Sequence, residues 1–347
     1  MNNIEHRTFA EIDLQDPFFQ SLRDDYDGFD DWFGRKHDQD AFVQYDDNHE
    51  IIGFLYLKVE ENLVDDIVPN IQAKKILKVG TFKIEAHGTK MGEQFIKIIS
   101  DYAVSEQVDV CYVTIFDKHA SLINLVQQFG FNFYGTKENG SKKENVYLKH
   151  MKMTTGNINK DFPLVNSCHA NKYLLSIYPK YHSVMFPDSI LTTENKKIIK
   201  DVSYTNSIHK IYVCTMSQVE DFKYGDIVVV YRTAEYGKNA EYSSVATSIC
   251  VVEEVKKQSE FSSFDKFYEY ACKYSVFDRD DLRKWYNKGG CKAIKMTYNG
   301  AFKKRIVRHE LAEKIGLDRD EYWGCMKLTD DQFRQIVTIG DVAGLIC

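Results

Sequence analysis

The sequence predicts a protein of mixed α/β (α+β) class with two domains, each built on its own sheet. The chain has 347 residues, enough for two hydrophobic cores, and its 44% hydrophobic and 28% charged residues are typical of a globular protein. Residues 76–131 alternate β-branched segments with segments of helical periodicity around a glycine turn. A second alternation of strands and helices begins near residue 207.

The N-terminal segment combines acidic and aromatic residues. Within residues 24–36, Phe29, Trp32 and Phe33 recur at helical spacing, which predicts a short helix with its apolar face turned inward. The acidic residues either form a solvated face or steer a cationic amine by long-range attraction. They are Asp24, Asp25, Asp27, Asp30 and Asp31. The other elements expected here are a strand at 8–14, a helix at 17–23, and strands at 41–45 and 51–59.

The central motif is a strand at 76–84, a glycine-containing loop at 87–92, and an amphipathic helix at 92–103. The first turn of a helix has backbone N–H groups without intrahelical partners, and the helix dipole favours negative charge there. The motif therefore predicts a site for an anion such as a pyrophosphate. A strand at 108–116, a helix at 118–128 and a strand at 145–150 are expected to follow.

This order of elements resembles the GNAT acetyltransferase superfamily over residues 1–153, which implies a mixed central sheet. The motifs that carry the resemblance are the loop His87-Gly88-Thr89-Lys90-Met91-Gly92 and the Phe129-Gly130-Phe131 sequence that closes the following helix. The family's loop pattern is Gln/Arg-x-x-Gly-x-Gly/Ala, and one branch has Arg-Gly-x-Lys-Leu-Gly. Here the arginine is absent, and Val126 occupies the position where many members have a tyrosine that reprotonates the thiolate.

The resemblance implies an enzyme, an N-acetyltransferase that uses acetyl-CoA as co-substrate and no metal. The strand residues Phe82, Lys83 and Ile84 would bind the pantetheine arm, with one N–H polarising the thioester. The loop residues His87, Gly88, Thr89, Lys90, Met91 and Gly92 would hold the pyrophosphate. The candidates for acid and base, chosen for their place near the loop or at the start of the next helix, are Glu85, His119 and Ser121.

Residues 154–206 are expected to form a linker and an interdomain packing segment, and residues 207–347 a second domain. Tyr224-Gly225-Asp226-Ile227, followed by Tyr231-Arg232, resembles the PUA-like superfamily that includes EVE and ASCH domains. That resemblance implies a small β-barrel with helices. The expected strands are 208–215, 225–231, 246–255 and 293–298, and the expected helices are 216–223, 261–273, 308–315 and 329–336.

The PUA-like resemblance implies a domain that recognises RNA or modified bases. Aromatic faces stack on bases and cations bind phosphates, so the aromatic and cationic residues are candidates for nucleic-acid contacts. They are Tyr231, Arg232, Tyr242, Lys303, Lys304 and Arg305. A solvated hairpin turn is an equal alternative for the lysines. The part of the chain after residue 154 has a net charge of only +3, against −9 before it, which favours a small pocket over a broad basic surface.

Two functional hypotheses stay open. One is an N-acetyltransferase whose acceptor amine is unknown and is either RNA-linked, as in aminoacyl-tRNA, or a metabolite or protein amine. The other is a catalytically weak GNAT scaffold that binds RNA or a nucleotide as a regulator. The eight cysteines lack any Cys-x-x-Cys pair, and no run of eighteen apolar residues occurs, so we expect a cytoplasmic protein without membrane contact. The oligomeric state is open, a homodimer included.

Overall fold

The computed structural model describes residues 4–85, 91–140, 142–189 and 207–347. These residues divide into two compact units, one ending at Met151 and the other beginning at Lys152. Each unit contains one sheet with both parallel and antiparallel pairs, so the predicted mixed α/β class is confirmed. Among the described helices, none has the length and apolar character needed to cross a bilayer.

The first unit is a seven-stranded sheet of order β1-β2-β3-β4-β5-β7-β6. Its strands are β1 Ile4–Thr8, β2 Asp40–Tyr45, β3 Ile51–Val64, β4 Ile71–Ile84, β5 Val110–Ile115, β6 Asn132–Asn139 and β7 Lys142–His150. Its helices are α1 Gln20–Asp25, α2 Phe29–Gly34, α3 Met91–Ser105 and α4 Ala120–Gln128. Among the described strands of this unit, β4 and β5 alone pair in parallel, because α3 carries the chain across the sheet between them.

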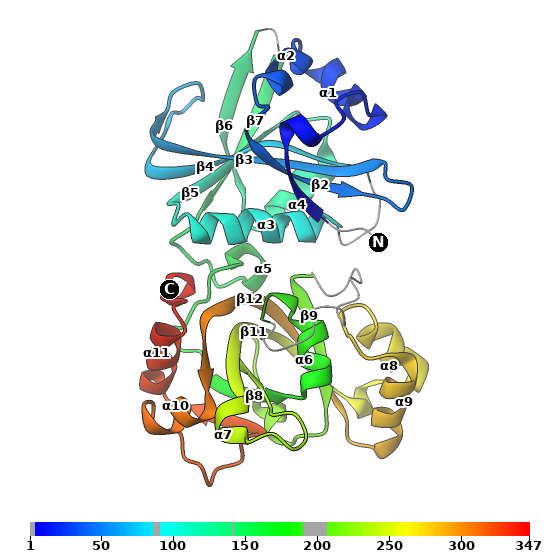
Figure 1. Cartoon of the computed structure of the whole chain (residues 1–347), viewed down its shortest axis with the longest axis vertical. Coiled ribbons are helices and arrows are strands. Elements are labelled where there is room, and N and C mark those ends of the chain that lie inside the picture. The colour runs from blue at the N-terminus through cyan, green and yellow to red at the C-terminus, as the bar shows by residue number, and fades with distance from the viewer. Residues whose placement is uncertain (1–3, 86–90, 141, 190–206) are drawn as a thin grey trace. The chain divides into compact units, whose positions relative to one another are not determined.

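The alternation of side chains along β3 separates the two faces of this sheet. Phe54 points to the face of α1 and α2, where its ring contacts those of Phe9, Phe19 and Phe33. Gly53 points to the other face, where a Cβ atom would lie 2.6 Å from the Phe95 ring of α3. Figure 1 accordingly shows α1 and α2 on one side of the sheet and α3 on the other.

Most predicted elements of the first unit are confirmed, with longer strands. The predicted strands at 51–59 and 76–84 extend to Ile51–Val64 and Ile71–Ile84, where they form a hairpin. The strand expected at 8–14 is wrong, because the strand ends at Thr8 and a 3-10 turn follows at Phe9–Glu11. Thr8 and Glu11 cap that turn reciprocally, a local signal that the alternation of apolar residues concealed.

The second unit is a six-stranded sheet of order β13-β8-β10-β11-β12-β9. Its strands are β8 Lys172–Ile177, β9 His209–Cys214, β10 Ile227–Arg232, β11 Val245–Lys257, β12 Lys292–Val307 and β13 Cys325–Leu328. Its helices are α5 Ile158–Asp161, α6 Pro179–Met185, α7 Ala240–Ser243, α8 Phe264–Ala271, α9 Arg279–Lys288, α10 Arg308–Glu313 and α11 Asp330–Ile339. Within the described residues the strand order has two ends, β13 and β9, so this unit has an open mixed sheet and not the predicted small barrel.

The interpretation of residues 154–206 as a linker and an interdomain packing segment is wrong for Lys172–Ile177. These residues form β8, which pairs with β10 in parallel and with β13 in antiparallel orientation. Leu174, Leu175 and Ile177 are fully buried there. Their apolar character was attributed to packing between domains, whereas it belongs to an interior strand of the second unit.

Candidate functional site

Strands β4 and β5 separate partway along their length. They pair from Ile76 with Val110 to Val79 with Val113, yet β4 continues to Ile84 and β5 to Ile115. Over Thr81–Ile84, β4 keeps its pairing with β3. In a paired strand, every second residue points its N–H and C=O groups away from the partner strand. Over this segment, those backbone groups of β4 point away from β3, toward the gap between β4 and β5. An extended ligand can pair with such an edge.

A β-bulge accompanies the separation. The register between β3 and β4 shifts between Tyr56 and Leu57, which leaves Gly80 as the extra residue on β4. A Cβ atom at Gly80 would lie 2.7 Å from the Tyr56 ring, so only glycine allows that ring to cover the strand here. Bulges bend the strand that carries them, and this one precedes the point where β4 leaves β5.

A cavity of about 470 Å³ opens at this point, within the size range of ligand pockets. Its lining includes residues 79–82 of β4 and residues 113–116 at the end of β5. The segment that joins α1 to α2 contributes Tyr26 and Asp27, β7 contributes Glu144, and His119 lies at the N-terminus of α4. We call this cavity the splay pocket.

His119 is paired with a buried carboxylate. Its Nε2 atom lies 3.3 Å from Oδ2 of Asp25, which is 7% exposed at the end of α1. The other carboxylate oxygen of Asp25 accepts from Lys118, and its carbonyl accepts from Lys142 at 2.6 Å. The Asp25 carboxylate therefore orients the imidazole, which itself stays 44% exposed at the pocket.

Tyr26 and Glu144 form a second polar pair in the splay pocket. The Tyr26 hydroxyl donates to Oε1 of Glu144 at 2.7 Å, and Glu144 is 3% exposed. Burial, reinforced by the charge of Glu144, raises the pKa of Tyr26 far above its usual range. Tyr26 thus remains protonated near neutral pH and holds the Glu144 carboxylate in place.

The structure separates the three predicted catalytic residues. His119 lines the splay pocket, whereas Glu85 and Ser121 are outside its lining. Glu85 is half exposed and forms an ion pair with Lys83 at 2.9 Å. Ser121 is exposed on the first turn of α4. From the sequence, Asp25 is only one member of an acidic segment, and no motif singles out Tyr26 or Glu144.

The predicted cofactor residues are described in part. Phe82 lines the splay pocket, and Lys83 and Ile84 continue the same edge of β4. His87, Gly88, Thr89 and Lys90 lie outside the described residues. Met91 and Gly92 begin α3, where the sequence predicted an anion site at the helix N-terminus.

Gly92 has a packing role that its sequence motif did not reveal. A Cβ atom there would lie 2.8 Å from the Leu125 side chain, so glycine permits close contact between α3 and α4. A large side chain at position 92 would therefore disturb helix packing whether or not a ligand is bound. Among the described residues, no group of three His, Cys, Asp or Glu side chains is placed to hold a metal ion.

The predicted nucleic-acid residues do not form one exposed surface. Tyr231 and Arg232 end β10 and are 2% and 3% exposed, and the Arg232 guanidinium donates to Glu235. Tyr242 is 64% exposed. Lys303, Lys304 and Arg305 belong to β12 rather than to a hairpin turn. Lys303 pairs with Asp341 at 3.4 Å, and Arg305 donates to the carbonyl of Phe302.

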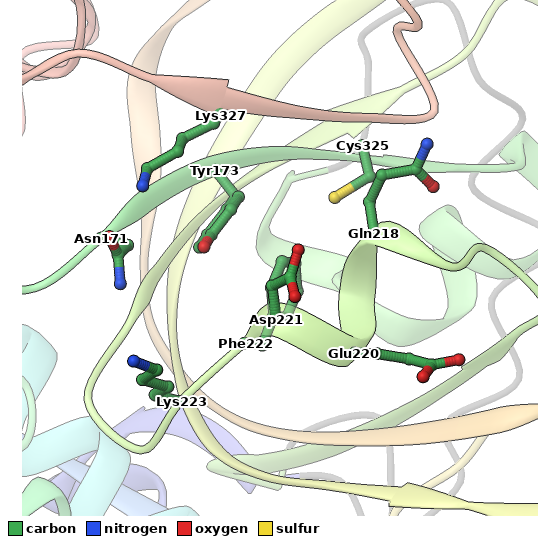
Figure 2. Close-up of a pocket in the computed structure, with 9 residues that line it drawn as sticks. All are labelled: Asn171, Tyr173, Gln218, Glu220, Asp221, Phe222, Lys223, Cys325 and Lys327. Atoms are coloured by element: carbon green, nitrogen blue, oxygen red, sulfur yellow. The ribbon is translucent and has the colours of Figure 1, made fainter.

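The second unit has a cavity of about 520 Å³ that the sequence did not predict (Figure 2). Tyr173 of β8 and Phe222 line it, with ring centroids 4.5 Å apart. Lys327 of β13 lies opposite Tyr173 in the strand register, and Lys223 enters from the loop before β10. Neither ammonium group has an ion pair with a described residue. We call this cavity the Tyr173 pocket.

Comparison with known proteins finds no matching family model and no matching curated protein. Solved structures similar to parts of the chain include an ASCH protein from Zymomonas mobilis, at 7% identity, covering 48% of this chain and 94% of that one, with a TM-score of 0.34. A GNAT family acetyltransferase from Elizabethkingia anophelis with acetyl-CoA bound has 12% identity, 43% and 97% coverage, and a TM-score of 0.33. A probable acetyltransferase from Staphylococcus epidermidis has 16% identity, 43% and 99% coverage, and a TM-score of 0.31.

Proposed function

We propose that the first unit is an N-acetyltransferase that transfers an acetyl group from acetyl-CoA to an amine in the splay pocket. The observation that carries the proposal is the separation of β4 from β5 beside the N-terminus of α3. The free edge of β4 can pair with the amide groups of a pantetheine arm, and the N–H groups of α3 can meet a pyrophosphate. The residues present therefore fit acetyl-CoA.

The side chains of the pocket supply the acid-base chemistry. When bound, acetyl-CoA supplies an activated thioester carbon. His119, oriented by Asp25, removes the proton that the amine loses as its nitrogen attacks. A backbone N–H of Phe82–Ile84 donates to the thioester oxygen as negative charge develops on it. Glu144, held by Tyr26, offers its charge to the cationic form of the amine before reaction.

Calorimetric titration of the full chain with acetyl-CoA tests this proposal, and α4 provides a matched pair of variants. Leu122 lines the splay pocket, whereas its neighbour Ser121 does not. Leu122→Trp should fill part of the cavity and weaken acetyl-CoA binding at least tenfold, while Ser121→Trp should leave the affinity unchanged. The absence of any binding of acetyl-CoA by the unmodified protein would refute the proposed activity.

A second candidate function follows from the Tyr173 pocket. We propose that the second unit binds a nucleotide or a short single-stranded RNA, either to recruit an RNA-linked acceptor or as a regulator. The pocket combines an aromatic wall with two lysines that have no ion pair among the described residues, and nucleic-acid sites pair aromatic rings with cations in this way. The alternative RNA-binding surface consists of the exposed residues Tyr242, Lys303 and Lys304.

Fluorescence anisotropy with a short single-stranded RNA distinguishes the two surfaces. Lys223→Glu combined with Lys327→Glu should lower the affinity at least tenfold, because two phosphate contacts are replaced by repulsion. Lys303→Glu combined with Lys304→Glu makes the same charge change on β12 and should have little effect. If only the variant with Lys303→Glu and Lys304→Glu loses RNA affinity, the binding site lies on β12. If all variants bind RNA equally well, the Tyr173 pocket is not the binding site.

A further inference from the structure

One wall of the splay pocket is strongly basic. Five cationic side chains line it, and we call them the basic wall: Arg35, Lys36, Lys58, Lys78 and Lys137. The carboxylates that line the same pocket are Asp25, Asp27 and Glu144. Asp25 is already paired with Lys118, and Asp27 lies 3.6 Å from Lys142, so these two carboxylates pair with cations outside the wall.

Part of the basic wall has no ion pair with a described residue. Lys58 pairs with Glu60 at 2.9 Å, and Lys137 pairs with Asp66. Within the described part of the chain, Arg35, Lys36 and Lys78 have no ion pair. The ammonium groups of Lys36 and Lys78 instead lie 5.4 and 5.8 Å from the ring centroids of Tyr56 and Tyr112. An anion entering the pocket would therefore meet positive charge without having to break an ion pair.

The strand register brings like charges together. Lys58 on β3 lies directly opposite Lys78 on β4. Like charges at directly opposed positions destabilise a sheet. Burial lowers the pKa of Lys78, and repulsion from Lys137 lowers it further, while attraction to Glu60 and Asp66 opposes the shift. Burial likewise lowers the pKa of Lys36, with repulsion from Lys58 and Arg35 added and attraction to Glu60 opposed to it. A bound anion would offset this repulsion.

We propose that the acceptor is a small molecule that carries both an amine and an anionic group, a carboxylate or a phosphate, and that the basic wall binds the anion. This inference rests on the proposed acetyltransferase function and adds the class of its acceptor. The splay pocket contains groups for both parts of such a molecule. His119, Asp25 and Glu144 are available to the amine, and the basic wall is available to the anion. Its volume of about 470 Å³ suits a small acceptor.

The reaction with such an acceptor is balanced without a further reactant. The amine nitrogen forms a bond to the acetyl carbon, and the bond between that carbon and sulfur breaks. The nitrogen loses one proton to His119, and the leaving thiolate gains one from the pocket or from water. The anionic group takes no part in bond making, so the basic wall acts by positioning the nitrogen.

Matched pairs of acceptors test the inference with the full chain and saturating acetyl-CoA. Each amino acid of a panel is compared with its decarboxylated amine, and phosphoethanolamine with ethanolamine. The anionic member of at least one pair should have a kcat/KM at least 100-fold higher, and the carboxylate and phosphate arms identify the preferred anion. Transfer to the members without an anionic group at equal or higher kcat/KM would overturn the inference while leaving the acetyltransferase proposal in place.

Variants connect the preference to the wall. Lys78→Met should raise KM for the anionic acceptor at least tenfold and leave acetyl-CoA affinity unchanged. Lys74→Met, on an exposed position of the same strand, is the matched control and should change neither. An unchanged KM in Lys78→Met would overturn the inference.

A binding measurement separates the inference from the proposed activity. Phosphoethanolamine and the panel amino acids are titrated calorimetrically into the protein without acetyl-CoA. At least one anionic amine should bind, and Lys36→Met combined with Lys78→Met should weaken it at least tenfold. If acetyl-CoA fails to bind but this result holds, only the acetyltransferase proposal fails. If no anionic amine binds, or the double variant binds it equally well, the basic wall is not an anion site.

Discussion

Replacing His119 with alanine is expected to lower kcat for acetyl transfer by about 10²-fold or more, the usual contribution of a general base. The imidazole is the one predicted acid-base group that lines the splay pocket, and Asp25 fixes its orientation at 3.3 Å. Because the side chain is 44% exposed, its removal should cost little folding stability. Steady-state kinetics with the preferred amine measure kcat for the unmodified protein and the variant. Thermal unfolding measures the stability of both.

Two controls for His119 come from the sequence-based candidates themselves. Ser121→Ala and Glu85→Gln alter residues outside the pocket lining and should keep kcat within about twofold, since surface changes of this kind rarely exceed ~0.5 kcal/mol. Asp25→Asn should lower kcat, because the imidazole loses the carboxylate that orients it. A large loss with Ser121→Ala and none with His119→Ala would contradict this assignment of the base.

Replacing Phe54 with alanine should reduce the free energy of unfolding of the first unit by about 3–5 kcal/mol. The side chain is fully buried on β3, and its ring contacts Phe9, Phe19 and Phe33 within the cluster that supports α1 and α2. Those helices position Asp25 and Tyr26, so the loss of packing should also weaken the pocket. Urea unfolding, followed by tryptophan fluorescence, measures the change.

Phe133 is the matched control for Phe54. It is a phenylalanine of the same unit on β6 but is 58% exposed. Phe133→Ala should therefore change the unfolding free energy by less than about 0.5–1 kcal/mol. Equal destabilisation by the two variants would mean that the aromatic cluster around Phe54 does not form the core of this unit.

Several elements of both units were predictable because their signals are local. The helix at Met91–Ser105 and the strands Val110–Ile115 and Ile227–Arg232 have apolar residues at the spacing of their own secondary structure. The strand Lys172–Ile177 has an equally apolar sequence, which by itself predicts only packing between the domains. Its place between β10 and β13 depends on pairing with residues more than fifty positions away, which no local pattern records.

The candidate site was likewise predictable only in part. By itself, the sequence determined the two α/β units, the strand that ends at Ile84, the helix that begins at Met91, and His119 as a candidate base. Only the tertiary structure decided that His119 meets Asp25 across 94 positions and that Tyr26 meets Glu144 across 118. It also decided that Lys58 and Lys78 stand opposite each other, because a β-bulge sets the register of β3 and β4. Side-chain pairing between distant segments follows from strand register and core packing, which depend on the whole unit and not on the spacing of residues within one segment.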